Sequence, residues 1–282
     1  MSTIRGRPFP RRCSCRRSTD GEWCRVGVLG VRAQLLSSKR KLLANPENPN
    51  PAPLATRMTD TVFLFDCDNT LLDNDQVRQD LRTHLEGEFG AEQSARYWTL
   101  YEALRDEIGY ADYLGAMQRF RLGAEGDPRM LRLASFLLDY PFADRLYPGA
   151  LAALTHCGRF GQTVILSDGD IVLQPRKLQR SGLWDAVESR VLIYIHKERM
   201  LDEMEQRFPA HHYVMVDDKM RVLAAMKAIL AQRLTTIFPR QGYYALDVGA
   251  NAAFPAADIT IERIGELTQF DFANALAPMR TS

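Results

Sequence analysis

The chain contains no apolar run long enough for a membrane span or for the hydrophobic core of a signal peptide. Its best candidate, residues 26–31, is interrupted by Gly27 and Gly30, whereas a membrane helix needs about 20 predominantly apolar residues in a row. Cysteine is also scarce, with 5 in 282 residues. Two of them, Cys67 and Cys157, lie in strand-like or helix-like stretches, which argues for a reducing compartment. We therefore expect a cytoplasmic protein that does not contact a membrane.

The chain also lacks a large net charge, since it is +1 overall, but that charge is unevenly spread. Residues 1–59 hold 12 Lys and Arg and 3 Asp and Glu, a net charge of +9, so the remainder carries −8. Residues 45–53 (NPENPNPAP) form a Pro/Asn linker that sustains neither helix nor sheet. We expect residues 1–57 to be a basic, disordered leader. A transit peptide, a nucleic-acid-binding arm and a start codon placed ahead of a true start at Met58 are the alternatives.

Residues 62–74 (VFLFDCDNTLLDN) are the stretch around which the rest of the chain is organised. Residues 62–65 are all apolar and predict a strand buried on both faces, which ends at two carboxylates, Asp66 and Asp68. In an open α/β sheet, ligands bind beyond the carboxyl ends of the strands. Two aspartates there repel each other unless a cation offsets their charge, and Mg²⁺ prefers carboxylate oxygens. Alone, the pattern is equally compatible with a simple turn.

Residues 64–72 resemble the first signature of the haloacid dehalogenase-like hydrolases. Three further stretches resemble the other signatures of that superfamily in the same order: residues 163–169 (TVILSDG), Lys197 after residues 191–196 (VLIYIH), and residues 213–218 (YVMVDD). The resemblance spans residues 62–218, and flanking strands extend it to about residue 270. Four ordered matches favour the family far more strongly than any one of them.

The helical and strand patterns agree with that resemblance. Residues 75–147 predict four amphipathic helices with apolar positions three or four residues apart. From residue 148 onward, strands alternate with helices, which predicts a parallel sheet. We therefore expect an α/β fold: a parallel, Rossmann-like sheet flanked by helices, with an inserted all-helical cap domain. The core is assigned to residues 58–74 and 148–275, and the cap to residues 75–147.

The resemblance implies a Mg²⁺-dependent phosphatase that hydrolyses a small phosphate monoester through an aspartyl-phosphate intermediate. Asp66 would be the nucleophile, and Asp68 the acid that protonates the leaving group and then activates water. Ser167 and Lys197 would stabilise the phosphoryl oxygens. Mg²⁺ would be bound by the Asp66 carboxylate, the Asp68 backbone carbonyl, and Asp218 with Asp217 beside it.

The substrate phosphate would also contact the residues next to these groups, so that the expected phosphate-binding set is Asn69, Thr70, Ser167, Asp168, Gly169 and Lys197. Three positions depart from the family pattern. Asn69 stands where many members have Gly, although Asn tolerates positive φ. Asp168 stands where many have Asn, and Val222 where many have an acidic residue, whose function Asp217 could replace.

Several alternatives remain at this point. Ser167 could simply cap the next helix, and Lys197 could be a solvated charge. The three histidines at 196, 211 and 212 read as surface or sheet-edge residues. A phosphomutase uses the same residues. A haloacid dehalogenase lacks the second carboxylate and needs no Mg²⁺, and a non-catalytic binding domain would not need Asp66 and Asp68. Phosphonate-cleaving relatives use a cap lysine, but residues 75–147 contain nine Arg and no Lys. We expect a small phosphorylated metabolite as partner, and no nucleic acid.

Overall fold

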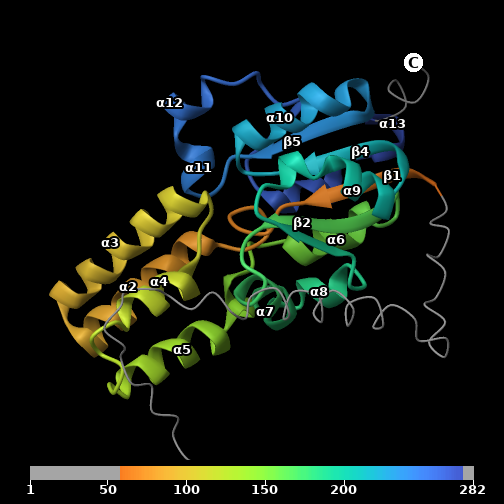
Figure 1. The fold of residues 1–282 in the computed structure, drawn as a ribbon. Coiled ribbons are helices and arrows are strands. Elements are labelled where there is room, and N and C mark those ends of the chain that lie inside the picture. The colour runs from red at the N-terminus through yellow and green to blue at the C-terminus, as the bar shows by residue number, and fades with distance from the viewer. Residues whose placement is uncertain (1–57, 276–282) are drawn as a thin grey trace, which may run out of the picture. The chain divides into compact units, whose positions relative to one another are not determined.

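The computed structural model describes residues 58–275, and the predicted basic leader, residues 1–57, lies outside the described residues. A six-stranded, fully parallel sheet runs through the core in the order β3-β2-β1-β4-β5-β6 (Figure 1). Its strands are β1 (Thr59–Phe65), β2 (Gln162–Asp168), β3 (Val191–Tyr194), β4 (Ala210–Val216), β5 (Leu234–Pro239) and β6 (Ile259–Ile261). The predicted fold class, a Rossmann-like parallel sheet with a helical insertion, is confirmed.

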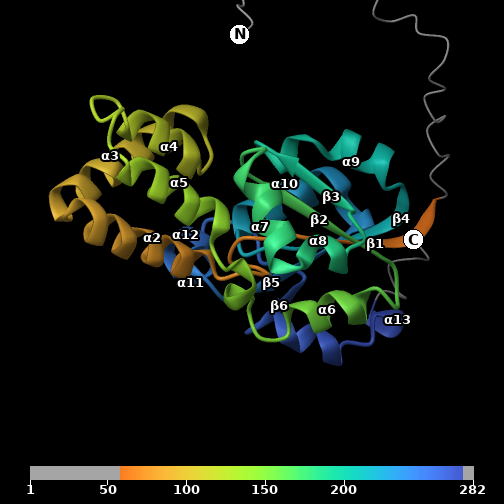
Figure 2. The same cartoon turned by 90° about the horizontal axis from the view of Figure 1, so that it is seen from below.

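The insertion lies between β1 and β2 and is wholly helical. Its elements are α2 (Asn74–Phe89), α3 (Ala91–Ile108), α4 (Tyr113–Phe120), α5 (Arg129–Asp139) and the 3₁₀ helix η1 (Phe142–Arg145). Figures 1 and 2 both show these helices gathered at one end of the core. Their apolar stripes pack together, for example Leu81 and Leu85 of α2, which are fully buried. The stripes are therefore the core of the cap, while the domain limits at 74/75 and 147/148 stay predictions.

The remaining helices belong to the α/β core. They are α6 (Ala150–Cys157), α7 (Leu173–Ser181), α8 (Leu183–Ala186), α9 (Leu201–Arg207), α10 (Met220–Leu230), α11 (Tyr243–Leu246), α12 (Val248–Asn251) and α13 (Phe272–Ala275), with the 3₁₀ helices η2 (Lys197–Arg199), η3 (Ala231–Arg233) and η4 (Ile264–Gln269). Between β3 and β4 the helical stretch is divided into η2 and α9. None of the helices within residues 58–275 is long and apolar enough to cross a membrane.

Alternate residues of β1 enter two separate hydrophobic clusters. Phe63 and Phe65 pack with α6, α7 and α8, whereas Val62 and Leu64 pack with α9 and α10. All four side chains are fully buried. Burying one such side chain stabilises a fold by about 1.5–3 kcal/mol, so this unbroken apolar run holds the sheet between its two helical layers. The same packing fixes the position of the carboxyl end of β1, where Asp66 follows.

His212 corrects one expectation, because it lies inside the sheet rather than at its edge. The side chain is only 2% exposed, and its Nε2 atom lies 2.8 Å from the Thr235 hydroxyl on β5.

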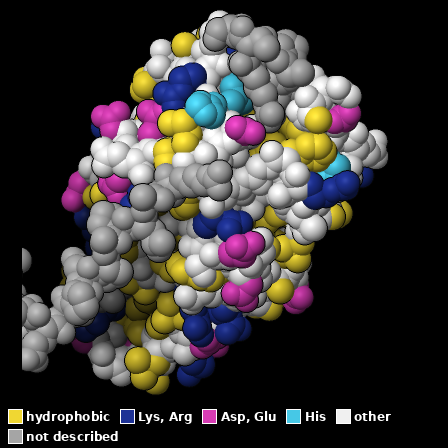
Figure 3. Space-filling model, turned by 90° about the vertical axis from the view of Figure 1, so that its right-hand side faces the viewer, with side chains coloured by type: hydrophobic (Ala, Val, Ile, Leu, Met, Phe, Trp, Pro, Cys, Tyr) yellow, Lys and Arg dark blue, Asp and Glu magenta, His cyan; other side chains and the backbone are white. Residues whose placement is uncertain are grey.

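Positive and negative charges are mixed on the surface of the core. On the side of the core shown in Figure 3, Lys and Arg side chains are interspersed with Asp and Glu side chains.

Gly149 provides a test of the packing between α6 and η4. Its φ is +85°, a backbone conformation that residues with a side chain rarely adopt, and an added Cβ would lie 2.7 Å from the Gly265 Cα atom. We expect Gly149→Ala to lower the free energy of unfolding by about 1–3 kcal/mol. The matched control is Gly87→Ala in α2, where an added Cβ meets nothing within 4 Å and should stabilise the helix by about 0.5–1 kcal/mol. Urea titrations measure the free energy of unfolding of both variants. Equal changes in Gly149→Ala and Gly87→Ala would contradict this packing.

Candidate active site

The signature residues converge at the carboxyl edge of the sheet because their strands are neighbours. β1 pairs with β2 on one side and with β4 on the other, in a register that aligns Phe65 with Ile165 and with Val216. Asp66 therefore follows β1 beside Ser167 at the end of β2. Asp217 and Asp218 follow β4 on the other side.

Asp66 is held by a buried lysine. Its Oδ1 atom lies 2.5 Å from Lys197 Nζ, and Lys197 is 0% exposed. The same ammonium lies 2.7 Å from Asp217 Oδ2. Burial alone would raise the pKa of Asp66, but the charge of Lys197, its hydrogen bond and the charge of Lys219 hold that pKa below its ordinary value. The interpretation of Lys197 as a solvated charge is wrong, and Asp66 is kept ionised.

Asp218 is the most unusual carboxylate of the site. It is completely buried, and neither of its oxygens has a hydrogen-bond partner among residues 58–275; Asp66 Oδ2 also lacks one. Burial, only partly opposed by Lys219, raises the pKa of Asp218 well above its ordinary value. One oxygen each from Asp66, Asp217 and Asp218 lie within 4.8 Å of one another. An unpaired buried charge is costly, so this trio fits a hard divalent cation such as Mg²⁺, which binds carboxylate oxygens.

Asp217 and Asp218 differ in their partners. Asp217 is ion-paired with Lys197, and its Oδ1 atom accepts a hydrogen bond from the backbone N–H of Lys219. The Asp218 carboxylate accepts no hydrogen bond from residues 58–275, whereas its backbone N–H donates to Thr70 Oγ1 at 3.0 Å. The geometry therefore favours Asp218 over Asp217 as a metal ligand, in line with the sequence interpretation.

Ser167 does not cap the following helix. The N-cap residue of α7 is Val172, and Asp170 Oδ1 accepts from the backbone N–H groups of Val172 and Leu173 where the helix begins. The Ser167 hydroxyl lies 3.5 Å from Asp66 Oδ1 and accepts a hydrogen bond of 2.9 Å from Gln174 Nε2. The hydroxyl is therefore positioned beside the Asp66 carboxylate, as the sequence interpretation requires.

Four of the six residues expected to bind phosphate also have structural partners within the protein. Asn69 has a φ of +61°, as expected for Asn in this turn, but its Oδ1 atom accepts from the backbone of Asn74 and Asp75 at the start of α2. Thr70 contacts the Asp218 backbone. Asp168 Oδ1 accepts from the Lys197 N–H, and the Gly169 N–H donates to the Tyr194 carbonyl. These contacts fix the loops, while Asn69, Asp168 and Gly169 also line the pocket, so contact of this set with phosphate stays a prediction.

Asp68 has a partner that the sequence interpretation missed. Lys177 of α7 is only 2% exposed in its side chain, and its Nζ atom lies 2.6 Å from Asp68 Oδ1 and 3.0 Å from Asn74 Oδ1. Asn74 Nδ2 in turn donates to Tyr113 Oη at 3.3 Å, on the cap helix α4. Asp68 lies outside the three-carboxylate cluster. Its carboxylate, 25% exposed, faces the pocket between the cap and the core.

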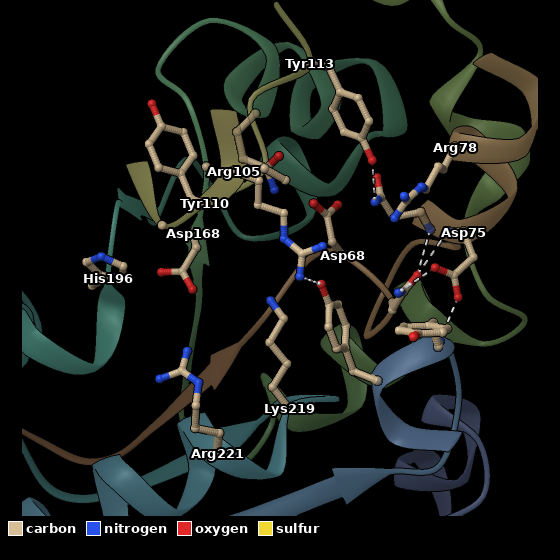
Figure 4. A pocket seen from close by; sticks show the side chains of 18 of the residues that line it. Asp68, Asp75, Arg78, Arg105, Tyr110, Tyr113, Asp168, His196, Lys219 and Arg221 are labelled. Atoms are coloured by element: carbon tan, nitrogen blue, oxygen red, sulfur yellow. Dashed lines mark hydrogen bonds between the residues drawn. The ribbon is translucent and has the colours of Figure 1, made fainter. Parts of the chain in front are cut away.

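A second missed lysine, Lys219, also faces this pocket. Its side chain projects into the pocket from the loop after β4, opposite the cap (Figure 4). Burial would lower the pKa of Lys219, but the charges of Asp66, Asp218 and Asp217 raise it well above its ordinary value. The ammonium is therefore a fixed positive charge close to Asp66.

The ion pair of Lys177 with Asp68 gives a stability prediction. We expect Lys177→Met to lower the free energy of unfolding by about 1–3 kcal/mol, because it leaves the Asp68 carboxylate and the Asn74 carbonyl without their donor. The adjacent Arg176 pairs with Asp139 at 3.0 Å, with side chains 43% and 60% exposed. Arg176→Met should therefore cost much less, no more than about 1 kcal/mol. Chemical denaturation of both variants measures the difference, and equal losses would contradict the importance of the buried pair.

Comparison with known proteins supplies the family. A model of the haloacid dehalogenase-like hydrolase family matches residues 61–229. The chain belongs to this family. A search of curated proteins found no match.

Similar solved structures agree with the assignment of the chain to this hydrolase family. A haloacid dehalogenase-like hydrolase from Burkholderia xenovorans LB400 is 65% identical, with a TM-score of 0.72, over 76% of this chain and 99% of that one. A haloacid dehalogenase-like family hydrolase from Xanthomonas campestris is 17% identical, with a TM-score of 0.55, over 79% and 94% of the two chains. An L-2-haloacid dehalogenase is 19% identical, with a TM-score of 0.53, over 75% and 97%. The last two likenesses concern the fold alone.

Proposed function

We propose that this hydrolase is a Mg²⁺-dependent phosphatase that cleaves a small phosphate monoester through an aspartyl-phosphate on Asp66. The observation that carries the proposal is the Asp218 carboxylate, which is buried near Asp66 and accepts no hydrogen bond within the described part of the chain, residues 58–275. A second carboxylate, Asp68, faces the same pocket and supplies the acid that a phosphate ester needs. When bound, Mg²⁺ would offset the charge of these carboxylates and of the phosphoryl oxygens.

The residues of the chain account for both halves of the reaction. An Asp66 oxygen attacks phosphorus, the bond from phosphorus to the ester oxygen breaks, and Asp68 gives that oxygen its proton. A water then attacks phosphorus, Asp68 takes a proton from it, and the bond to Asp66 breaks to release inorganic phosphate. Lys197 and the Ser167 hydroxyl stabilise the phosphoryl oxygens throughout. Lys197 is already oriented by two carboxylates, so its charge needs no rearrangement.

The pocket limits the size of the substrate. Its cavity has a volume of about 360 Å³ and lies between cap residues such as Arg105 and core residues such as Lys219. A cavity of this size suits a small ligand. The proposed partner is therefore a small phosphorylated metabolite rather than a macromolecule.

A substrate panel tests this proposal. Protein freed of metal by EDTA is incubated with sugar, nucleotide and glycolate phosphates, with and without Mg²⁺, and released inorganic phosphate is measured. Asp66→Asn protein purified in parallel controls for contaminating phosphatases. We expect Mg²⁺-dependent release that the variant lacks.

Two other outcomes would replace the proposal, the second of them measured after 2-chloropropionate is added to the panel. Conversion of a sugar phosphate to its isomer without phosphate release would indicate a phosphomutase. Halide release from 2-chloropropionate without phosphate release from any ester would indicate a dehalogenase.

A further inference from the structure

The cap wall of the pocket contains two arginines that share a single carboxylate. Arg78 of α2 lies 2.5 Å from Glu102, and Arg105 lies 3.2 Å from the other oxygen of the same residue. Both arginines line the pocket, whereas Glu102 does not. Two guanidinium charges against one carboxylate leave a net charge of +1 on this part of the wall.

The two arginines differ in their freedom to bind a ligand. Arg78 lies over the rings of Trp98 and Tyr101, at 4.9 and 5.3 Å from their centroids, so its guanidinium is packed into the cap. The Arg105 guanidinium instead extends into the middle of the pocket (Figure 4). It makes hydrogen bonds to Glu102 and to the Tyr244 hydroxyl. Because a guanidinium has five N–H donors, Arg105 retains donors for a ligand.

Tyr244 connects this charge with the proposed catalytic centre. It belongs to α11 of the core, and its hydroxyl accepts the Arg105 hydrogen bond at 2.9 Å. Lys219, next to Asp218 in the chain, lies 5.4 Å from the centroid of the same ring. Arg105, at the hydroxyl, and Lys219, over the ring, therefore contact the same tyrosine, and both line the pocket. The cavity thus has one cation beside Asp66 and another toward the cap.

The acidic residues that line the pocket do not neutralise Arg105. None of them is paired with Arg105 by an ion pair within residues 58–275, where Glu102 is its partner. Most accept hydrogen bonds from nearby backbone N–H groups and hold loops in place: Asp75 from Tyr243, Asp168 from Lys197, Asp170 from Val172 and Leu173, and Asp247 from Ala250. Asp68 is paired with Lys177.

We propose that Arg105, supported by Tyr244, binds a second anionic group of the substrate, so that the preferred substrates are small phosphate monoesters that also carry a carboxylate or a second phosphate. The inference rests on the proposed phosphatase function for the end of the substrate that is cleaved. A guanidinium recognises carboxylate and phosphate by the same charged hydrogen bonds. The charge at Arg105 therefore selects for a second anion, and the volume of about 360 Å³ selects for a short molecule.

Pairs of esters with and without a second anionic group distinguish recognition of that group from recognition of the phosphate ester. We compare 3-phosphoglycerate with glycerol 3-phosphate, and 1,3-propanediol bisphosphate with propyl phosphate. The wild type should prefer the more anionic member of at least one pair. Arg105→Met should lower kcat/KM for that member about 10- to 100-fold, the effect of losing a charged hydrogen bond, with little change for its partner. Arg105→Lys should recover part of the preference.

The control is Arg119→Met, which removes a cap arginine that pairs with Glu107 outside the pocket. It should leave both members of each pair unchanged. No preference in the wild type, or equal losses on both members in Arg105→Met, would overturn the inference. Which pair shows the preference decides between a carboxylate and a second phosphate.

Binding without turnover distinguishes failure of this inference from failure of the proposed function. Calorimetry with Mg²⁺ measures the Kd of each ester for Asp66→Asn protein and for the same protein carrying Arg105→Met. Tighter binding of the more anionic ester that Arg105→Met abolishes would support the anion site even if no phosphate is released. Turnover without any such preference would overturn the anion site alone, and binding of none of the esters would overturn both.

Discussion

Asp66→Asn should abolish turnover while the protein stays folded. The amide keeps the shape of the carboxylate but cannot attack phosphorus, and loss of a covalent nucleophile lowers kcat by roughly 10⁴- to 10⁶-fold. Lys197 would retain its ion pair with Asp217 at 2.7 Å. The pKa of Asp66 lies below its ordinary value, so its charge is favourable in the folded state and its loss should slightly lower the melting temperature.

The measurement is a steady-state assay with the best substrate of the panel, together with thermal unfolding. Asp60→Asn is the matched control, since Asp60 lies exposed on β1 away from the cluster, and it should keep full activity. Activity of Asp66→Asn within tenfold of the wild type would contradict a covalent role for Asp66.

Removal of Mg²⁺ should lower kcat about as much as Asp66→Asn does. We expect EDTA to abolish activity and added Mg²⁺ to restore it. Mg²⁺ should also raise the melting temperature, because a ligand that binds only the folded state at 100 times its Kd contributes about 2.7 kcal/mol. Asp218→Asn should remove the Mg²⁺-dependent rise. Since burial raises the pKa of Asp218, its ionised form opposes folding above its ordinary pKa. The metal-free variant should therefore melt at a higher temperature than the metal-free wild type near neutral pH.

The variant Asp217→Asn distinguishes the contribution of metal binding from that of the ion pair between Asp217 and Lys197. Burial raises the pKa of Asp217 despite its ion pair with Lys197, so metal-free Asp217→Asn, like Asp218→Asn, should melt at a higher temperature than the metal-free wild type near neutral pH. Because Asp217 is already paired with Lys197, however, Asp217→Asn should keep most of the Mg²⁺-dependent rise that Asp218→Asn loses. Thermal unfolding of both variants in EDTA and in Mg²⁺ provides the comparison. Full activity in EDTA, or the same response from both variants, would contradict the assignment of Asp218 as the principal ligand.

The sequence predicted the convergence of Asp66, Ser167, Lys197 and Asp218 because strand order and strand ends follow from apolar runs and parallel crossovers. It could not predict which side chains the loops use for their own hydrogen bonds. Asn69 and Thr70 have the right chemistry for phosphate, and their side chains also accept hydrogen bonds from the start of α2 and from the Asp218 backbone. Which side chains a loop uses in this way depends on distances of a few tenths of an ångström, which a motif does not contain.

Lys177 left a signal in the sequence that could have been used. The buried residues of α7 are Leu173, Gln174, Lys177, Leu178 and Ser181, so Lys177 occupies the apolar stripe, where a lysine requires a carboxylate partner. Arg105 and Tyr244 left none. They are 139 residues apart, and the placement of α11 against the cap follows from packing that no periodic pattern encodes.

The most direct test of the central claim is to trap the phosphoryl group on the enzyme. Protein mixed with substrate and Mg²⁺ is quenched rapidly in acid and digested, and its peptides are analysed by mass spectrometry. We predict that the peptide containing Asp66 gains one phosphoryl group, that the gain requires Mg²⁺, and that Asp66→Asn shows none. Substrate turnover without phosphorylation of that peptide at any quench time, or phosphorylation at another residue, would contradict the account.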